Sequence, residues 1–141
     1  MKSNQLHDLW TSPDNTRLTS KQFSFRLPVH IAAKIAALCE IYPQKNRTQI
    51  VADLLTAAID DLEKHLPEAP GEPVEESVND DIAEQIGEEG QIYYLGGTRG
   101  WFRETANKHY SELEKELGNE NPDALYPNLV GTEAQFTKSG K

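Results

Sequence analysis

Polar and apolar residues alternate along residues 21–28. The apolar positions are Phe23, Phe25 and Leu27, and the polar positions between them are Gln22, Ser24 and Arg26. A period of two is typical of a β-strand that has one apolar and one polar face. Pro28 lacks a backbone N–H and suits the first position of a helix. The pattern therefore predicts one short strand that ends where a helix begins.

Two amphipathic helices are predicted after this strand. Apolar residues recur every three or four positions between Val29 and Tyr42, and again from Asn46 to about His65. Such spacing places the apolar side chains on one face of a helix. Pro43 ends the first helix because a residue before proline avoids helical geometry, and Asn46 suits the N-cap of the second. We therefore expect a mostly α-helical fold with one short strand.

The remaining segments show weaker patterns. Residues 1–20 have no sustained periodicity and are expected to form a flexible arm. Residues 67–90 combine prolines and glycines with nine acidic residues and no basic residue, which indicates an acidic linker with at most a short helix around 80–86. Residues 91–118 predict a small segment built on an amphipathic helix, and residues 119–141 a polar tail.

Charge is distributed unevenly along the chain. Residues 15–52 carry six basic residues against one acidic residue, a local net charge of +5, whereas the whole chain has a net charge of -9. The single cysteine, Cys39, excludes a disulfide within the chain. No apolar run approaches the roughly 20 residues that a membrane span needs. We therefore expect a cytoplasmic protein with no membrane partner.

Neither a metal site nor an enzyme active site is predicted. The four histidines, His7, His30, His65 and His109, are scattered and lack metal-ligand spacing. The acidic residues of 67–90 lie in a segment too rich in proline and glycine to hold two carboxylates at a fixed distance. The glycine-rich run at 96–100 lacks the spacing of a nucleotide-binding loop. We expect no catalytic residue, metal or cofactor.

The predicted strand has no second strand nearby in the sequence. A lone strand is unstable because its backbone N–H and C=O groups lack partners. A second copy of the chain would supply a partner strand, and four helices would cover the apolar face. This predicts an intertwined homodimer with a two-stranded antiparallel ribbon. Its expected core is Phe23, Phe25, Leu27, Ile35, Leu38, Ile50, Leu54 and Leu55.

The order of strand, proline, helix, turn and polar-capped helix over residues 21–66 resembles the ribbon-helix-helix family of bacterial and phage repressors. Its members include the Arc and methionine repressors, which read DNA with strands. The segment 22–28 is similar to the Arc strand, in which a Gln-x-Asn-x-Arg pattern faces the bases. Ser24 stands where that pattern has asparagine, and the turn at 43–46 lacks the glycine that is frequent in the family.

The resemblance implies specific contacts with double-stranded DNA. Gln22, Ser24 and Arg26 would contact base edges in the major groove, with Arg26 suited to guanine and Gln22 to adenine. The amides at the start of the second helix would bind a backbone phosphate. The expected phosphate contacts are Arg17, Lys21, Lys45, Asn46, Arg47 and Thr48.

The function favoured by this pattern is a sequence-specific transcriptional regulator of prokaryotic type, a repressor, that binds DNA as a homodimer or a higher-order assembly. Two alternatives stay open. One alternative is an antitoxin whose C-terminal region binds a toxin while the N-terminal domain binds DNA. The other is a protein-interaction adaptor. The apolar face of the helix predicted from Trp101 onward would form either a local core or a surface for a protein partner.

Overall fold

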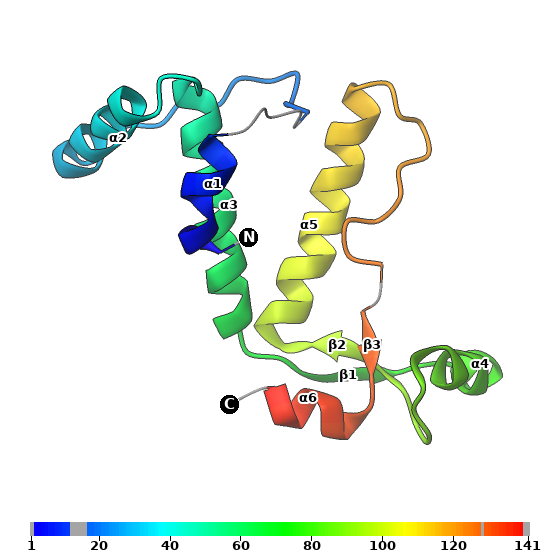
Figure 1. The fold of residues 1–141 in the computed structure, drawn as a ribbon. Helices are drawn as coiled ribbons and strands as arrows, with labels where there is room; N and C mark the ends of the chain where they lie inside the picture. The colour runs from blue at the N-terminus through cyan, green and yellow to red at the C-terminus, as the bar shows by residue number, and fades with distance from the viewer. Residues whose placement is uncertain (1, 12–16, 128, 140–141) are drawn as a thin grey trace. The chain divides into compact units, whose positions relative to one another are not determined.

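The structure is a computed structural model that describes residues 2–11, 17–127 and 129–139. The chain divides into two compact units, Met1–His65 and Leu66–Lys141, which we call unit 1 and unit 2. Figure 1 shows the elements of each unit. No helix in the described ranges has both the length and the apolar character needed to cross a membrane.

Unit 1 is helical. It contains the 3₁₀ helix η1 (Ser3–Gln5) and the α-helices α1 (Leu6–Trp10), α2 (Val29–Ile41) and α3 (Arg47–His65). Helices α2 and α3 occupy the ranges in which the apolar periodicity predicts helices. The buried core consists of Leu6, Trp10, Ile50 and Ala57, with Leu9, Leu38, Cys39, Tyr42 and Leu54 packed against it.

A capping box begins α3. The Gln49 backbone N–H donates to Asn46 Oδ1 at 2.8 Å, and the Asn46 N–H donates to Gln49 Oε1 at 3.1 Å. This reciprocal pair satisfies two backbone N–H groups at the helix start that have no partner within the helix. The N-cap predicted at Asn46 is confirmed.

The predicted strand is absent. Residues 22–28 form coil, and the three strands found in the described ranges all lie in unit 2. The prediction of a mostly α-helical chain with one short strand, folded as a ribbon-helix-helix homodimer around a two-stranded ribbon, is therefore wrong. Alternating side chains give a segment two faces, but a strand also needs a neighbouring backbone that accepts and donates its hydrogen bonds. No backbone hydrogen bond joins residues 22–27 to another described segment.

The first part of the expected flexible arm, 1–20, is folded. Residues 3–10 form η1 and α1, and Leu6 and Trp10 are buried. Residues 12–16 of that arm lie outside the described residues. A helix of five residues is too short to show a sustained apolar period, so the sequence pattern did not reveal it.

Unit 2 is built around a three-stranded antiparallel sheet with the order β1-β2-β3. Along the chain it contains β1 (Ala69–Pro73), α4 (Glu76–Ile86), β2 (Tyr93–Gly96), α5 (Gly97–Glu116), β3 (Val130–Gly131) and α6 (Glu133–Ser139). Helix α5 contacts β1 and β2, and α6 contacts β1. A buried cluster of Val74, Ala83 and Ile92 forms its core, with Ile82, Ile86 and Val130 packed against it.

This arrangement differs from the expected linker, small helical segment and polar tail. The linker range contains β1 and α4, residues 91–118 contain β2 as well as α5, and the tail range contains β3 and α6. Strand β1 has the sequence Ala-Pro-Gly-Glu-Pro, which lacks alternation, and it forms because β2 pairs with it. Gly71 permits this close approach, since a Cβ there would lie 2.8 Å from the Tyr94 carbonyl oxygen.

Polar side chains fix the loops of unit 2. Asn79 on α4 accepts a hydrogen bond from the Ile92 N–H at 2.8 Å and donates to the Gly90 carbonyl at 2.9 Å. Arg99 on α5 forms a 2.8 Å salt bridge with Glu68, which precedes β1. These bonds hold α4 and α5 to the chain that flanks the sheet.

Candidate nucleic-acid interface

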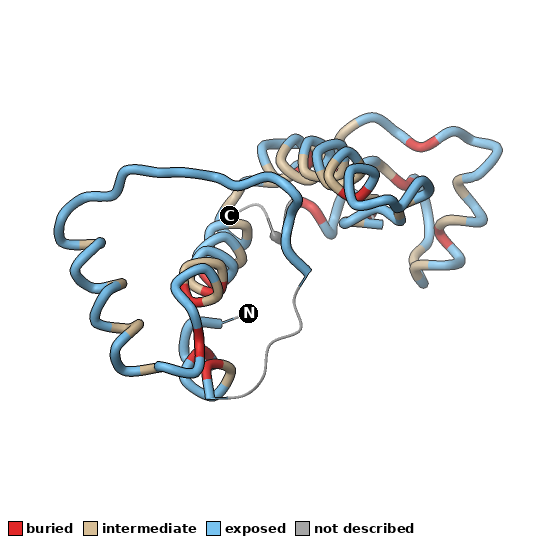
Figure 2. The backbone as a smooth tube through the Cα atoms, turned by 90° about the horizontal axis from the view of Figure 1, so that it is seen from above, coloured by how far each residue is buried: buried red, intermediate tan, exposed pale blue. Residues whose placement is uncertain are grey.

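Residues 17–28 lead into α2 with every side chain exposed, and we call them the N-segment. Figure 2 shows this exposure along the backbone trace before α2. The three residues expected to contact bases, Gln22, Ser24 and Arg26, all lie in the N-segment. None of the three forms a hydrogen bond or ion pair with the described parts of the chain. Their polar groups are therefore available to a ligand.

The N-segment also exposes large apolar side chains. Phe25 is 76% exposed, and Val29 at the start of α2 is 87% exposed. Phe23 and Leu27 are exposed as well. Leu55, Ile59 and Leu62 form an exposed stripe on one face of α3, which we call the α3 stripe.

The area of these side chains is large for a single chain. The N-segment residues Phe23, Phe25 and Leu27, together with Val29 and the α3 stripe, are about half to nine-tenths exposed. With roughly 150–200 Å² for each fully exposed large apolar side chain, their exposed area is on the order of 700 Å². That value is close to the about 800 Å² that one partner contributes to a standard protein interface.

Only part of the expected dimer core is buried within one chain. Ile50 is buried, and Ile35, Leu38 and Leu54 are half-buried in unit 1. The other expected core residues, Phe23, Phe25, Leu27 and Leu55, are exposed. The structure thus brings together Leu38, Ile50 and Leu54 in one cluster. It leaves Leu55 on α3 and the three N-segment residues uncovered.

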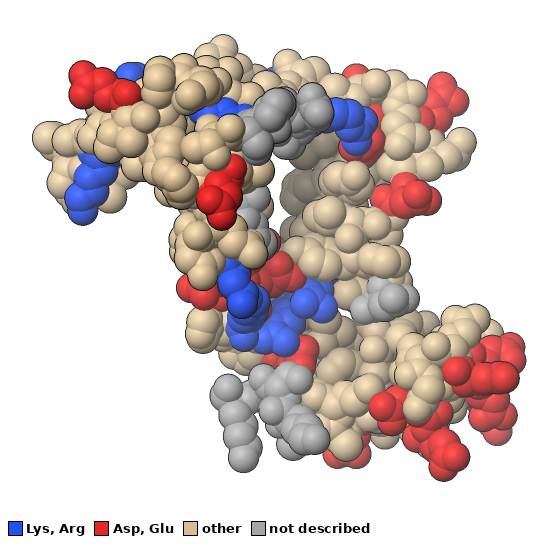
Figure 3. All heavy atoms as spheres, viewed as in Figure 1, with Lys and Arg blue, Asp and Glu red and all other residues tan. Residues whose placement is uncertain are grey.

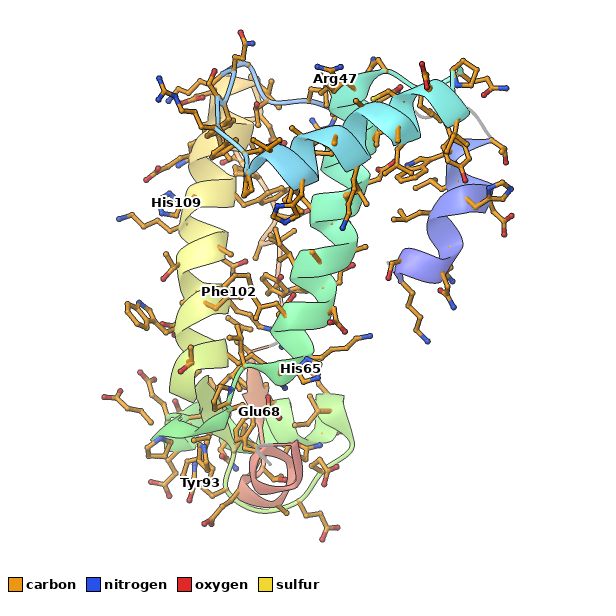
Figure 4. All side chains as sticks on the ribbon, turned by 90° about the vertical axis from the view of Figure 1, so that its left-hand side faces the viewer. Arg47, His65, Glu68, Tyr93, Phe102 and His109 are labelled. Carbon is orange, nitrogen blue, oxygen red and sulfur yellow. The ribbon has the colours of Figure 1, made fainter. Side chains whose placement is uncertain are left out.

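The expected phosphate contacts lie in three places. Arg17 and Lys21 lie in the N-segment, and both interact with other parts of the chain. Lys45 lies in the turn before α3 and is only 6% exposed, so the fold covers most of this side chain. Arg47 and Thr48 are exposed in the first turn of α3, where Figure 4 labels Arg47.

The start of α3 retains free backbone donors. The Asn46 side chain is engaged with Gln49 in the capping box. The backbone N–H groups of Arg47 and Thr48 form no hydrogen bond with the described chain. Helix N-termini with free amides favour anions such as phosphate. Asn46 therefore caps this helix start, and the amides of the next two residues have no partner within the described chain.

Acidic side chains gather in unit 2. Figure 3 shows them over the part of the unit that contains α4. The helix itself carries Glu76, Asp80, Asp81 and Glu84, and no basic residue. The charges of the N-segment and α2 are mainly positive. The N-segment and α2 therefore favour an anionic ligand, whereas the α4 region disfavours one.

Two polar pairs in unit 1 were not anticipated from the sequence. Trp10 Nε1 donates to Asp53 Oδ2 at 2.7 Å, and His7 Nδ1 lies 2.7 Å from the Tyr42 hydroxyl. The pair of Trp10 and Asp53 has one trace in the sequence. Asp53 interrupts the apolar face of α3, and a buried carboxylate in such a position requires a hydrogen-bond donor.

No group of three or more His, Cys, Asp or Glu side chains within the described ranges is arranged to hold a metal ion. No family model, curated protein or solved structure matches the chain. The function is therefore inferred from the side chains of the two units themselves.

Proposed function

We propose that this protein is a DNA-binding transcriptional regulator, a repressor, and that unit 1 contains its DNA-binding surface. The observation that carries this proposal is the exposed N-segment, in which Gln22, Ser24 and Arg26 have no partner within the described chain. The segment carries Arg17, Lys21 and Arg26 and no acidic residue, a net charge of +3. A segment with this charge suits a polyanion.

The chemistry of the three side chains fits base recognition. An arginine donates two hydrogen bonds to guanine O6 and N7, a glutamine pairs similarly with adenine, and a serine bonds to either. The free amides at Arg47 and Thr48 would bind a backbone phosphate and fix the position of the protein on the duplex. Base contacts then supply specificity, and phosphate contacts supply most of the affinity.

The active species is a homodimer. The exposed apolar area of the N-segment, Val29 and the α3 stripe is about what one partner buries in a standard interface. Association through these side chains needs no strand, and a two-fold dimer would present two N-segments to a palindromic site. Such a regulator would act in the cytoplasm of a prokaryotic cell.

The proposal is tested with a duplex selected from a random DNA pool. Arg26→Ala is expected to weaken binding by about 1–3 kcal/mol, because it removes a bidentate base contact. Lys108→Ala is the matched control, since it removes an exposed cation from α5 in unit 2. Affinity is measured by fluorescence anisotropy. Equal affinities for the wild type and Arg26→Ala would contradict the assignment of the N-segment as the reader.

A second candidate is an antitoxin, supported by one observation in unit 2. Trp101 on α5 is 73% exposed, and exposed tryptophans are frequent anchors of protein interfaces. Under this hypothesis unit 2 binds a toxin while unit 1 binds DNA. Co-purification of a small basic protein with the wild type, and its loss from Trp101→Ala, would favour the antitoxin.

A protein-interaction adaptor would instead bind DNA weakly and with equal affinity for all sequences.

A further inference from the structure

Helix α1 is held on α3 by a buried hydrogen bond. Trp10 Nε1 donates to Asp53 Oδ2 at 2.7 Å, and the two residues are 3% and 8% exposed. Leu6, one turn earlier, is also buried against α3 residues. Isolated helices of this length are not stable in water. The helical form of α1 therefore depends on its attachment to α3.

The same helix is attached to the end of α2. His7 Nδ1 lies 2.7 Å from the hydroxyl of Tyr42, and the Trp10 ring lies edge-on to the Tyr42 ring with 5.1 Å between centroids. Tyr42 is the C-cap residue of α2. Helix α1 thus contacts both helices near the turn that joins them.

A groove of about 390 Å³ lies beside the contact of α1 with α3, and its walls include Leu6 from α1 and Leu54 and Ala57 from α3. Neither Trp10 nor Asp53 lines the groove, and both residues are buried. Their hydrogen bond therefore lies in the closely packed part of the contact.

This attachment has a consequence for the N-segment, which follows α1 and precedes α2. We propose that Trp10 and Asp53 are positioning residues, because by holding α1 on α3 they anchor the chain that leads into the N-segment. This inference rests on the proposed DNA-binding function. A segment held at both ends samples fewer conformations than an arm held at one end. Less conformational entropy is then lost when Gln22, Ser24 and Arg26 bind DNA.

The test uses the full-length chain with paired substitutions. Trp10→Phe keeps an aromatic ring but removes the N–H donor, so the Asp53 carboxylate remains buried without a partner. The double variant Trp10→Phe, Asp53→Leu also removes the carboxylate, and removing both partners of a buried hydrogen bond is far less costly than removing one. Trp101→Phe is the matched control, because Trp101 is exposed in unit 2.

Three quantities are measured by NMR and anisotropy: amide exchange in α1, fast backbone motion of the N-segment, and affinity for a DNA duplex of mixed sequence. Trp10→Phe is expected to accelerate α1 exchange about tenfold, a factor that corresponds to 1.4 kcal/mol. It should increase N-segment motion and weaken duplex binding roughly tenfold, the effect of about one additional residue to be ordered on binding. The double variant lacks the hydrogen bond but buries no unpaired carboxylate, so it should reverse the three changes in part, and Trp101→Phe should cause none.

Several outcomes would overturn the proposal. Unchanged α1 exchange in Trp10→Phe would show that the hydrogen bond does not hold the helix. Acceleration to the same extent throughout α2 and α3 would make α1 part of one cooperative core. Unchanged N-segment motion, or unchanged affinity in a wild type that binds DNA, would refute the positioning role. A wild type that binds no duplex would refute the proposed function instead, while the motion of the N-segment still decides whether α1 anchors it.

Discussion

The two units of this chain differ in how far they bury their apolar side chains. In unit 2, Val74, Ala83 and Ile92 are buried together, and the three strands pair with one another. In unit 1, Phe23 and Phe25 remain exposed beside a small helical core. Unit 2 buries a core that includes its sheet, although Trp101 on α5 stays exposed, whereas unit 1 leaves the apolar side chains of the N-segment uncovered. Under the proposed function, we expect unit 1 to be the unit that associates with a second chain.

The charges of the two units extend this comparison. Residues 15–52 have a local net charge of +5, and residues 68–90 carry nine acidic residues without a basic one. Basic side chains attract the phosphates of a polyanion and acidic side chains repel them. Under the proposed function, we therefore expect no contact between the acidic region of unit 2 and DNA. We therefore expect perturbations of the two units to affect different properties.

The largest effect is expected from a core substitution in unit 2. Ile92 is fully buried, so Ile92→Ala should destabilise unit 2 by about 2–5 kcal/mol. Val78→Ala is the control, because Val78 is exposed on α4. Urea unfolding of the two variants measures the difference. DNA affinity should stay unchanged in both variants, and a loss of DNA binding in Ile92→Ala would show that the units do not act separately.

A somewhat smaller effect is expected on association through unit 1. Phe25→Asp places a charge in the exposed apolar surface and should weaken dimerisation by about 2 kcal/mol, as for a central interface residue. The helical content of the chain should not change, since Phe25 is 76% exposed. Sedimentation equilibrium of Phe25→Asp and of Trp101→Asp measures association. Identical dimerisation constants for the wild type and Phe25→Asp would contradict the assignment of the N-segment to the dimer interface.

Removal of unit 2 should have a modest effect in the opposite direction. A chain without residues 67–141 lacks the acidic residues of 68–90, so non-specific DNA affinity should rise severalfold at low salt because the repulsion is gone. Dimerisation should persist. Sedimentation and anisotropy test both points, and a truncated chain that stays monomeric would locate the interface partly in unit 2.

The smallest effect is expected for one phosphate contact. Arg47→Ala should weaken binding about equally for all sequences and should reduce the slope of log affinity against log salt by about 1. Glu104→Ala on α5 is a control in which the slope stays unchanged. A wild-type affinity that does not vary with salt would contradict the phosphate contacts altogether.

The sequence predicts local elements of this fold better than its pairings. Helices α2 and α3 follow from long apolar periods, a terminating Pro43 and an Asn46 cap, which all act within a few residues. The strand predicted at 21–27 fails because alternation specifies faces but not the second backbone that a strand requires. The opposite error occurs at β1, whose prolines and glycine suggest a linker although β2 pairs with it.

The features of the candidate site that depend on contacts between distant segments could not be predicted from the sequence either. Gln22, Ser24 and Arg26 are exposed, but Phe23, Phe25 and Leu27 between them are exposed as well, so the alternation does not separate a buried face from an exposed one. Burial of Lys45 and the hydrogen bond from Trp10 to Asp53 depend on contacts between segments far apart in the chain. Residues distant in sequence meet only through tertiary packing, which a local periodicity does not encode.

Selection of bound fragments from a random DNA pool at physiological salt would show whether the N-segment reads a DNA sequence. We expect enrichment of one sequence with two-fold symmetry, and loss of that enrichment in Arg26→Ala. A pool that remains random after repeated selection with the wild-type chain would contradict sequence-specific DNA binding.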